Sequence, residues 1–275
     1  MALADDFGGL LIDLDGVVWI GREPVPGSAE ALRELLAAGK ELVFVTNNPT
    51  KPPAEYARRL GEMGVEVGPE RIVTAGMVAA RLAGEAAGDG GAAFVIGAKP
   101  LKEMVAAELV ARKVHDPDRG NHNSAVLDVE RGGEAAVVVV SGHRGFGFDE
   151  LLTAKRALDA GAALVATSRD PTMPMPGGEW PGTGAVLAAV ETASGRTAEI
   201  AGKPERHLFE MALAAIGGAT PVAMIGDRIS SDIAGGHDVG LATVLVLSGT
   251  TDAEEAAAAE PRPDNVVADL AALLR

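Results

Sequence analysis

Two aspartates spaced by one residue follow a short apolar run near the start of the chain. Leu10 to Ile12 read as a buried strand, Asp13 and Asp15 come at its end, and Gly16 follows directly. Alternation along an extended chain puts the carboxyl groups of Asp13 and Asp15 on the same side, where their repulsion is costly unless a cation neutralises them. The spacing therefore indicates a metal ion, and it also suits a nucleophile paired with a proton donor.

A solvated turn or a calcium loop would explain the same Asp-x-Asp-Gly string. A calcium loop of the helix-loop-helix kind needs further oxygen ligands downstream, and the Val-Val-Trp-Ile run at 17–20 supplies none. The choice between these interpretations therefore depends on the other polar positions of the chain.

Thr46 and Asn47 stand at the end of a second expected strand, 42–46. A helix expected at 28–38 connects the two strands in a β-α-β unit. Both strands should therefore end at the same edge of a parallel sheet, where such folds bind ligands. A hydroxyl and exposed backbone N–H groups at this edge could hold a phosphate. An Asn-Asn-Pro turn that only ends the strand is the alternative.

Lys203, Asp227 and Asp232 lie at two further strand ends. Lys203 precedes a helix whose first turn would hold Pro204, and a lone lysine there is normally solvated. Asp227 ends a buried strand at 222–226, and either later aspartate could simply cap a helix. All four strand ends should nevertheless open on one sheet edge, where they supply a nucleophile, an acid, a phosphate site, a cation and carboxylates for a hard metal. This inventory is that of phosphoryl transfer.

The β-α alternation of both ends of the chain is interrupted in the middle. Glycines at 88–91 and a proline- and glycine-rich stretch at 171–182 read as linkers. We expect an α/β fold with a doubly wound parallel-sheet, Rossmann-like core of residues 1–87 plus 182–275 and an inserted α/β cap domain of residues 88–181. The elements expected in the insert are strands at 93–96, 125–129, 135–140 and 163–167 and helices at 101–112 and 150–160.

Composition excludes several classes of function. Asp and Glu number 39 against 24 Lys and Arg, a formal charge of -15, which opposes binding to nucleic acid. The chain has no cysteine, so disulfides and thiolate sites are excluded and the cytoplasm is the expected compartment. Residues 1–9 do not resemble a signal peptide, and no run reaches the ~18 apolar residues of a membrane helix. We therefore expect a protein that binds neither nucleic acid nor membrane.

The four strand-end motifs resemble those of the haloacid dehalogenase superfamily of aspartate-nucleophile phosphatases. Their sequences, in order, are Asp-Leu-Asp-Gly-Val at 13–17, Val-Thr-Asn-Asn at 45–48, Gly-Lys-Pro at 202–204 and Gly-Asp-Arg-Ile-Ser-Ser-Asp-Ile at 226–233. The Thr-Asn-Asn motif and the insert of roughly a hundred residues resemble the corresponding features of subfamily IIA. That branch contains p-nitrophenyl phosphatases, phosphoglycolate and glycerol-3-phosphate phosphatases and nucleotide monophosphatases.

This resemblance implies a role for each motif residue. Asp13 would be the nucleophile and a Mg²⁺ ligand, and Asp15 the general acid/base, which also offers its backbone carbonyl to the metal. Asp227 would ligate the same ion. The other implied roles are phosphate binding by Thr46, Asn47 and Lys203, and support of the metal ligands or their water by Asp232.

The insert departs from the family pattern at two turns. Ser-Gly-His-Arg-Gly follows the strand at 135–140 where a Gly-Leu-Asp-type turn is common, and Thr-Ser-Arg precedes Asp170 where an Asn is common. Because the insert caps the site in this branch, these changes point to substrate choice, and a glycine-rich surface loop is the alternative for the first turn. The positions expected to influence specificity are His143, Arg144, Ser168, Arg169 and Asp170.

The leading hypothesis is a Mg²⁺-dependent phosphatase that hydrolyses a small phosphate monoester through an aspartyl-phosphate intermediate. Glycerol 3-phosphate and phosphoglycolate are the candidate substrates, with p-nitrophenyl phosphate as a surrogate. The alternatives are a nucleoside monophosphate phosphatase and an inactive ligand-binding protein on the same scaffold. The expected partner is a small phosphorylated metabolite, and a homodimer is left open.

Overall fold

The computed structural model describes residues 2–113, 126–175 and 178–275. Parts of two expected features, the strand at 125–129 and the proline- and glycine-rich stretch at 171–182, fall outside these residues. The chain divides into two compact units, of which the first comprises Met1–Thr46, Pro53–Val73 and Lys203–Arg275 and the second Asn47–Pro52 and Thr74–Gly202. None of the helices in the described ranges combines the length and the apolar composition needed to cross a membrane.

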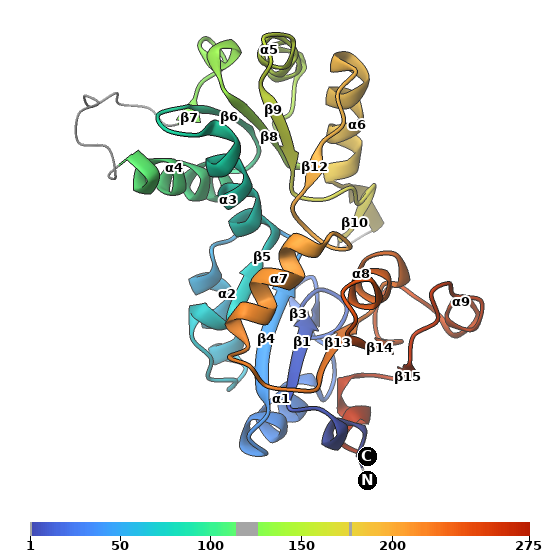
Figure 1. The fold of residues 1–275 in the computed structure, drawn as a ribbon. Coiled ribbons are helices and arrows are strands. Elements are labelled where there is room, and N and C mark those ends of the chain that lie inside the picture. The colour runs from blue at the N-terminus through green and yellow to red at the C-terminus, as the bar shows by residue number, and fades with distance from the viewer. Residues whose placement is uncertain (1, 114–125, 176–177) are drawn as a thin grey trace. The chain divides into compact units, whose positions relative to one another are not determined.

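The first unit is built on a six-stranded sheet with the order β15-β14-β13-β1-β4-β5 (Figure 1). β1 runs parallel to both of its neighbours, and β14 and β15 continue in the same direction. β1 is buried throughout, as expected for a central parallel strand covered on both faces. The strands are β1 (Gly9–Asp13), β4 (Glu41–Thr46), β5 (Ile72–Thr74), β13 (Val222–Gly226), β14 (Ala242–Val246) and β15 (Asn265–Val267).

Helices cover both faces of this sheet. Alternate β1 residues, Leu10 and Ile12, join apolar residues of α1 (Ser28–Ala37) and α2 (Pro53–Glu62) in one core. Met224 of β13 faces the other way, where Gly236 of α8 (Ala234–Asp238) approaches it. α7 (Arg206–Ala215) contacts β4 and α8. This is the expected doubly wound arrangement.

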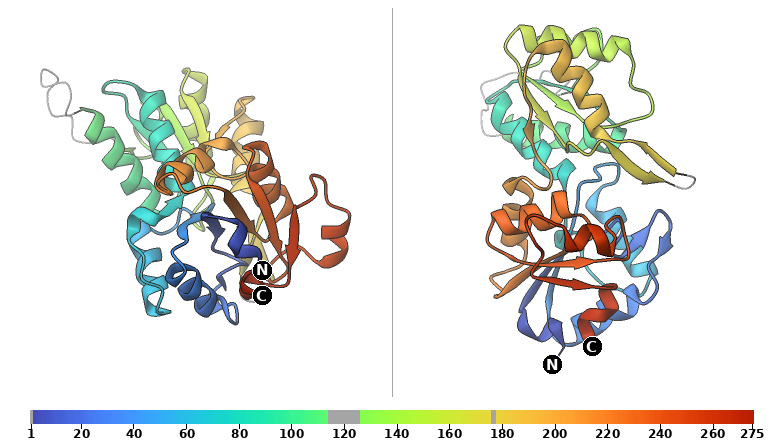
Figure 2. Two further views of the ribbon diagram at one scale, coloured as in Figure 1. Left: turned by 60° about the horizontal axis from the view of Figure 1, so that its bottom comes forward. Right: turned by 90° about the vertical axis from the view of Figure 1, so that its right-hand side faces the viewer.

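The second unit has its own five-stranded, fully parallel sheet in the order β12-β9-β8-β6-β7 (Figure 2). α5 (Phe148–Asp159) and α6 (Thr183–Ser194) pack into one core with alternate residues of β6 and β8. α3 (Ala75–Ala87) packs on β8, β9 and α4 (Lys99–Lys113). The strands are β6 (Ala93–Ile96), β7 (Val126–Leu127), β8 (Val137–Val140), β9 (Ala163–Ala166) and β12 (Glu199–Ile200). The predicted α/β fold class is confirmed.

The boundaries between the two units differ from the expected domain boundaries. α3 and α6 were expected in the core, but each packs on the second sheet, α3 through β8 and β9 and α6 through α5 and β8. The alternation of strands and helices does not reveal which sheet a helix covers, because the periodicity of a helix reports only that one side is apolar. The assignment of the units as catalytic core and cap stays a prediction.

Short elements are the ones that sequence patterns did not predict. Two antiparallel hairpins, β2 (Trp19–Ile20) with β3 (Glu23–Pro24) and β10 (Thr172–Met175) with β11 (Gly178–Pro181), contain prolines, which weaken a strand pattern. β5 and β15 are three residues each. The remaining helical segments are η1 (Leu3–Asp6), η2 (Pro69–Arg71), η3 (Gly132–Glu134), η4 (Ile229–Ile233), α9 (Ala253–Ala257) and η5 (Leu270–Leu274).

Candidate active site

Polar residues gather at the carboxyl-terminal edge of the first sheet. Asp13 is the last residue of β1 and pairs in register with Val45, so it lies beside the end of β4, where Thr46 is buried. Ile12 pairs with Ile225, which places Asp227, just after β13, on the other side of Asp13. Parallel strands thus bring these three residues to one edge, as the sequence predicted. The expectation that the strand before Lys203 ends at the same edge is wrong, because that strand is β12, which pairs with β9 in the second sheet.

Three buried carboxylates lie close enough to share one cation. Oxygens of Asp13, Asp227 and Asp232 are within 4.8 Å of one another. The Lys203 Nζ lies 2.6 Å from Asp13 Oδ1 and 2.6 Å from Asp232 Oδ1, and the lysine is only 3% exposed. Lys203 is therefore a buried ion-pair partner and not the solvated lysine usual at such a position. Three carboxylates and one ammonium leave an excess of negative charge that a divalent cation would neutralise.

Asp227 sits in a cradle formed by two glycines and a backbone amide. Its Oδ2 accepts a hydrogen bond of 2.7 Å from the Thr250 backbone N–H. A Cβ at either Gly16 or Gly249 would overlap the Asp227 carboxylate, and Gly16 also has φ +93°, which favours glycine. Asp227 Oδ1 is buried and has no hydrogen-bond partner among the described residues. A buried carboxylate oxygen without a partner is a feature expected of a metal ligand.

Asp232 is brought back over the end of β13 by the π-helical turn η4. Its backbone N–H donates to the Arg228 carbonyl, and its Oδ2 accepts a 3.0 Å hydrogen bond from the Arg228 backbone N–H. The side chain packs so closely on Gly226 that a Cβ there would overlap it. Gly226 is therefore needed for Asp232 to reach both Lys203 and the other carboxylates.

The crowding of charges shifts the pKa values of this cluster. Burial raises the pKa of Asp13 well above its usual value, Lys203 opposes the shift, and the Asp232 and Asp227 carboxylates add to it. Burial also raises the pKa of Asp227, and Asp232 adds to that rise. For Lys203, burial alone would lower the pKa, but Asp13 and Asp232 outweigh burial, so the net shift is upward. The lysine therefore stays charged at neutral pH.

The donor set fits Mg²⁺. All candidate ligand atoms are carboxylate oxygens, the donors that a hard cation prefers, and a small number of them suits an ion that keeps several of its waters. The absence of nitrogen and sulfur ligands from the cluster argues against a zinc or copper site there.

Asp15 is not one of the three carboxylates that lie within 4.8 Å of one another, and the expectation that it faces the same side as Asp13 stays a prediction. β1 ends at Asp13, and the chain turns at Gly16, so the period-two rule no longer applies at residue 15. The Asp15 Oδ1 instead accepts a hydrogen bond of 3.1 Å from the indole nitrogen of Trp19. The carboxylates that crowd Asp13 come from Asp227 and Asp232.

Asn47 follows Thr46 directly but belongs to the second unit. Its Nδ2 donates a 3.0 Å hydrogen bond to Asp170 Oδ2, which also lies in that unit. A Cβ at Gly202 would overlap Asn47 Oδ1 and the Thr167 carbonyl. Asn47 is thus held by contacts inside the second unit, and its role in binding phosphate stays a prediction.

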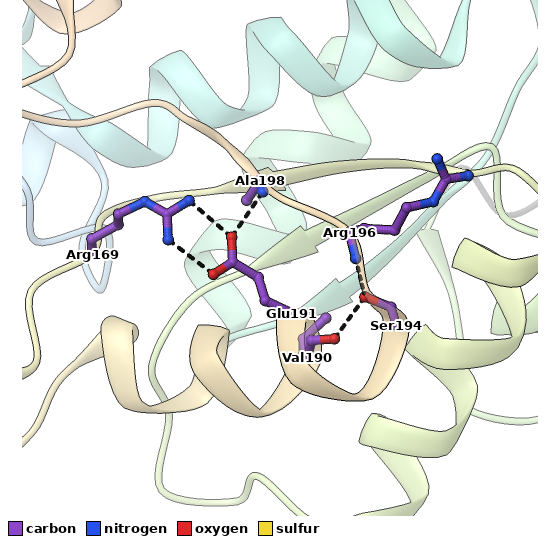
Figure 3. Close-up of polar contacts among 6 residues, drawn as sticks. All are labelled: Arg169, Val190, Glu191, Ser194, Arg196 and Ala198. Carbon is purple, nitrogen blue, oxygen red and sulfur yellow. Dashed lines mark hydrogen bonds and ion pairs between the residues drawn. The ribbon is translucent and has the colours of Figure 1, made fainter.

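The other candidates of the insert follow β8 and β9, neighbouring parallel strands of the second sheet. His143 contacts Glu150 at 3.0 Å, and the Arg144 guanidinium lies 4.8 Å from the ring centroid of Trp180. Figure 3 shows Arg169 making a two-pronged ion pair with Glu191, at 2.8 and 2.9 Å, while Glu191 also accepts from the Ala198 N–H. Ser168 is buried and its hydroxyl accepts from the Asp170 N–H. Arg169 is therefore held by a structural ion pair.

Sequence reasoning missed Gly249, Thr250 and Trp19. The first two belong to a Ser-Gly-Thr-Thr run that begins two residues after the end of β14, at the same sheet edge as Asp13, Thr46 and Asp227. Its position after a buried strand is the signal that could have identified it. From the sequence, Trp19 is only one of four residues after Gly16 that supply no oxygen ligand for calcium.

We predict that Mg²⁺ stabilises the protein more at about pH 7.5 than at about pH 5. In the folded, metal-free protein the pKa values of Asp13 and Asp227 are raised above 3.8, the usual value for an aspartate. The folded state therefore keeps protons that the unfolded state loses, and the contribution of this site to stability falls as pH rises. Mg²⁺ binds the ionised carboxylates and removes that penalty. At about 100 times its Kd, Mg²⁺ should add about 2.7 kcal/mol to the free energy of unfolding. Thermal melts with Mg²⁺ or EDTA test this, and equal shifts at both pH values, or a full shift in Asp227→Asn, would contradict it.

Gly249→Ala should weaken Mg²⁺ binding while the protein stays folded. The new methyl group overlaps the Asp227 carboxylate and must displace it from its cradle. We expect an affinity loss of about tenfold or more, measured by calorimetric titration. Gly133→Ala is the control, because a Cβ at Gly133 meets only an ordinary van der Waals contact, and the variant should leave the Mg²⁺ affinity unchanged. Gly39→Ala would be a poor control, because the φ of +75° at Gly39 favours glycine.

Comparison with known proteins agrees with the motifs. The family model described as haloacid dehalogenase-like hydrolase matches residues 10–109, and a second, HAD-hydrolase-like model matches residues 200–273. Chronophin from Mus musculus is 38% identical over 269 residues, covering 94% of this chain and 87% of chronophin.

Two solved structures are similar along nearly the whole chain. Glycerol phosphate phosphatase from Mycobacterium tuberculosis in complex with magnesium has a TM-score of 0.84 and 31% identity, covering 100% of this chain and 78% of that one. The p-nitrophenyl phosphatase from Archaeoglobus fulgidus has a TM-score of 0.83 and 31% identity, covering 98% of both chains. The resemblance inferred from the motifs is thereby confirmed. The chain belongs to the haloacid dehalogenase-like hydrolases, in the branch of the glycerol-phosphate and p-nitrophenyl phosphatases.

Proposed function

We propose that this protein is a Mg²⁺-dependent phosphatase of small phosphate monoesters, with the catalytic residues in the first unit. The observation that carries the proposal is the buried group of Asp13, Asp227, Asp232 and Lys203 at the sheet edge. Its charge and donor atoms suit a divalent cation together with a phosphoryl group. The magnesium complex of the similar glycerol phosphate phosphatase supports the choice of ion.

The reaction assigns different tasks to the two aspartates of the opening motif. A carboxylate oxygen of Asp13 attacks phosphorus, the P–O bond to the leaving alcohol breaks, and Asp15 donates a proton to the departing oxygen. A water molecule then attacks the aspartyl phosphate, its proton passes to Asp15, and inorganic phosphate and the Asp13 carboxylate are released. Asp13, Asp227 and the Asp15 carbonyl would hold Mg²⁺, which would supply positive charge to offset the charge of the phosphoryl group.

Lys203 and its neighbours prepare Asp13 for attack. The ammonium group lies 2.6 Å from Asp13 Oδ1, so it favours the ionised carboxylate that the nucleophile requires. Its second ion pair, to Asp232, keeps it beside Asp13, where it can offset the charge of a phosphoryl group together with the Thr46 hydroxyl. Asp232 thus acts by holding Lys203. Binding of phosphate by the Asn47 amide is part of the same proposal.

We further propose that the second unit is the cap that selects the substrate. Polar residues follow its two adjacent strands β8 and β9, and among the described residues Arg144 has no carboxylate partner, unlike Arg169. A glycerol phosphate and p-nitrophenyl phosphate, on which the similar proteins act by name, are the substrates to try first. The homodimer and the cytoplasmic location stay predictions.

Asp13→Asn should abolish phosphate release while leaving the fold intact. An amide oxygen is a poor nucleophile for phosphorus, and we expect a loss of about 10³-fold or more in kcat. The assay is phosphate release from p-nitrophenyl phosphate with Mg²⁺, with EDTA as the metal-free control. More than a few per cent of wild-type activity in a properly folded Asp13→Asn protein would refute the nucleophile assignment.

Arg144→Ala should change the ranking of substrates and leave Mg²⁺ binding intact. A cation over an aromatic ring can add contacts to an anionic or hydroxyl-bearing ester, so its removal should alter kcat/KM unequally, by about three- to tenfold among substrates. A panel of glycerol 3-phosphate, phosphoglycolate, p-nitrophenyl phosphate and a nucleoside monophosphate measures this. Arg131→Ala, which removes an exposed arginine paired with Glu134 in the same unit, is the matched control. An unchanged ranking would argue against Arg144 as a specificity residue.

A further inference from the structure

The Trp19 indole donates a hydrogen bond to the Asp15 carboxyl group. Its Nε1 donates to Asp15 Oδ1 at 3.1 Å, and the tryptophan is 1% exposed. The turn between the two residues is closed by the backbone as well, because the Gly16 N–H donates to the Trp19 carbonyl at 2.7 Å and the Trp19 N–H to the Leu14 carbonyl at 3.2 Å. Trp19 and Asp15 are thus fixed relative to each other.

Two residues of α2 hold the indole in place. The Tyr56 ring stacks on it with an interplanar angle of 4° and a centroid distance of 6.4 Å. The Arg59 guanidinium lies 3.8 Å from the centroid of the Trp19 ring and also donates to the Gly21 carbonyl at 2.9 Å, which ties it to the hairpin of β2 and β3. A buried ring contacted by a stacked ring and a cation has little freedom to turn. The direction of the indole N–H is therefore set by the first unit's core.

We propose that Trp19 is a positioning residue that orients the carboxyl group of Asp15 for proton transfer, an inference that rests on the proposed phosphatase function. An indole nitrogen can only donate a hydrogen bond, so Asp15 Oδ1 must remain an acceptor throughout the reaction. The proton that passes between Asp15 and the leaving alcohol is then carried by Oδ2. Trp19 touches neither substrate nor metal in this scheme and acts through Asp15.

Trp19→Phe is the decisive variant, because it keeps an aromatic ring in the stack and removes the N–H donor. Leaving-group protonation matters for an alkoxide and far less for nitrophenolate, which is already a stable anion. We expect kcat/KM to fall about tenfold for glycerol 3-phosphate and less than about twofold for p-nitrophenyl phosphate. The ratio kcat/KM is the proper readout, because it reports the steps up to loss of the alcohol and excludes hydrolysis of the common intermediate.

A double-mutant cycle separates positioning from general structural damage. In an Asp15→Asn background, Trp19→Phe should cause no further change with either substrate, because its target has lost the transferable proton. Leu35→Val is the control, since it trims a buried side chain of the same apolar core and keeps the indole N–H, and both substrates should respond to it equally. Equal losses on both substrates in Trp19→Phe, or an undiminished effect in the Asp15→Asn background, would overturn the proposal.

Arg59→Met provides a second variant if Trp19→Phe melts at a much lower temperature. It removes the bond to Gly21 and a cation that lies over the indole and also attracts the Asp15 carboxylate, but it leaves Trp19 in place. We therefore expect a smaller loss, of about threefold, again confined to glycerol 3-phosphate. If Asp15→Asn itself affects both substrates alike, the acid role of Asp15 in the proposed function fails, and this inference with it. If Asp15→Asn discriminates between them and both Trp19→Phe and Arg59→Met do not, only the inference about Trp19 fails.

Discussion

The repulsion among three buried carboxylates is the constraint on which the first unit depends. Desolvating Asp13, Asp227 and Asp232 within 4.8 Å of one another is unfavourable, and Lys203 offsets only part of their charge. Lys203 is 190 residues from Asp13 in sequence, so the site forms only when the first and last parts of the chain fold together. A buried charge cluster of this kind is retained for its chemistry, because apolar residues would stabilise the same sheet edge better.

Backbone shape at the sheet edge makes this crowding achievable. Gly16, Gly226 and Gly249 leave out the side chains that would otherwise occupy the space of Asp227 and Asp232. Backbone N–H groups of Arg228 and Thr250 satisfy one oxygen of each carboxylate. Of the remaining oxygens, Asp232 Oδ1 lies 2.6 Å from Lys203 Nζ, and Asp227 Oδ1 is buried with no hydrogen-bond partner among the described residues. The same geometry that destabilises the metal-free fold therefore favours binding of a divalent cation.

Two aspartates only two residues apart are placed in different surroundings. Asp13 ends a buried strand among carboxylates and a lysine, whereas Asp15 lies beyond the turn at Gly16 against the Trp19 indole. Different surroundings are what allow neighbouring carboxyl groups to take the separate tasks of nucleophile and acid. In the second unit the same logic distinguishes Arg169, which Glu191 neutralises, from Arg144, which stacks on Trp180.

The sequence by itself determined the β-α alternation, the four strand-end motifs and the family, because apolar periodicity, glycine and proline turns and short motifs are local properties. Only the tertiary structure decided that α3 and α6 cover the second sheet, and that Gly249 and Thr250 frame Asp227. Those facts depend on contacts between segments far apart in the chain. Alternation along the chain could not decide where the Asp15 carboxyl group lies, because alternation holds only within a strand and β1 ends at Asp13.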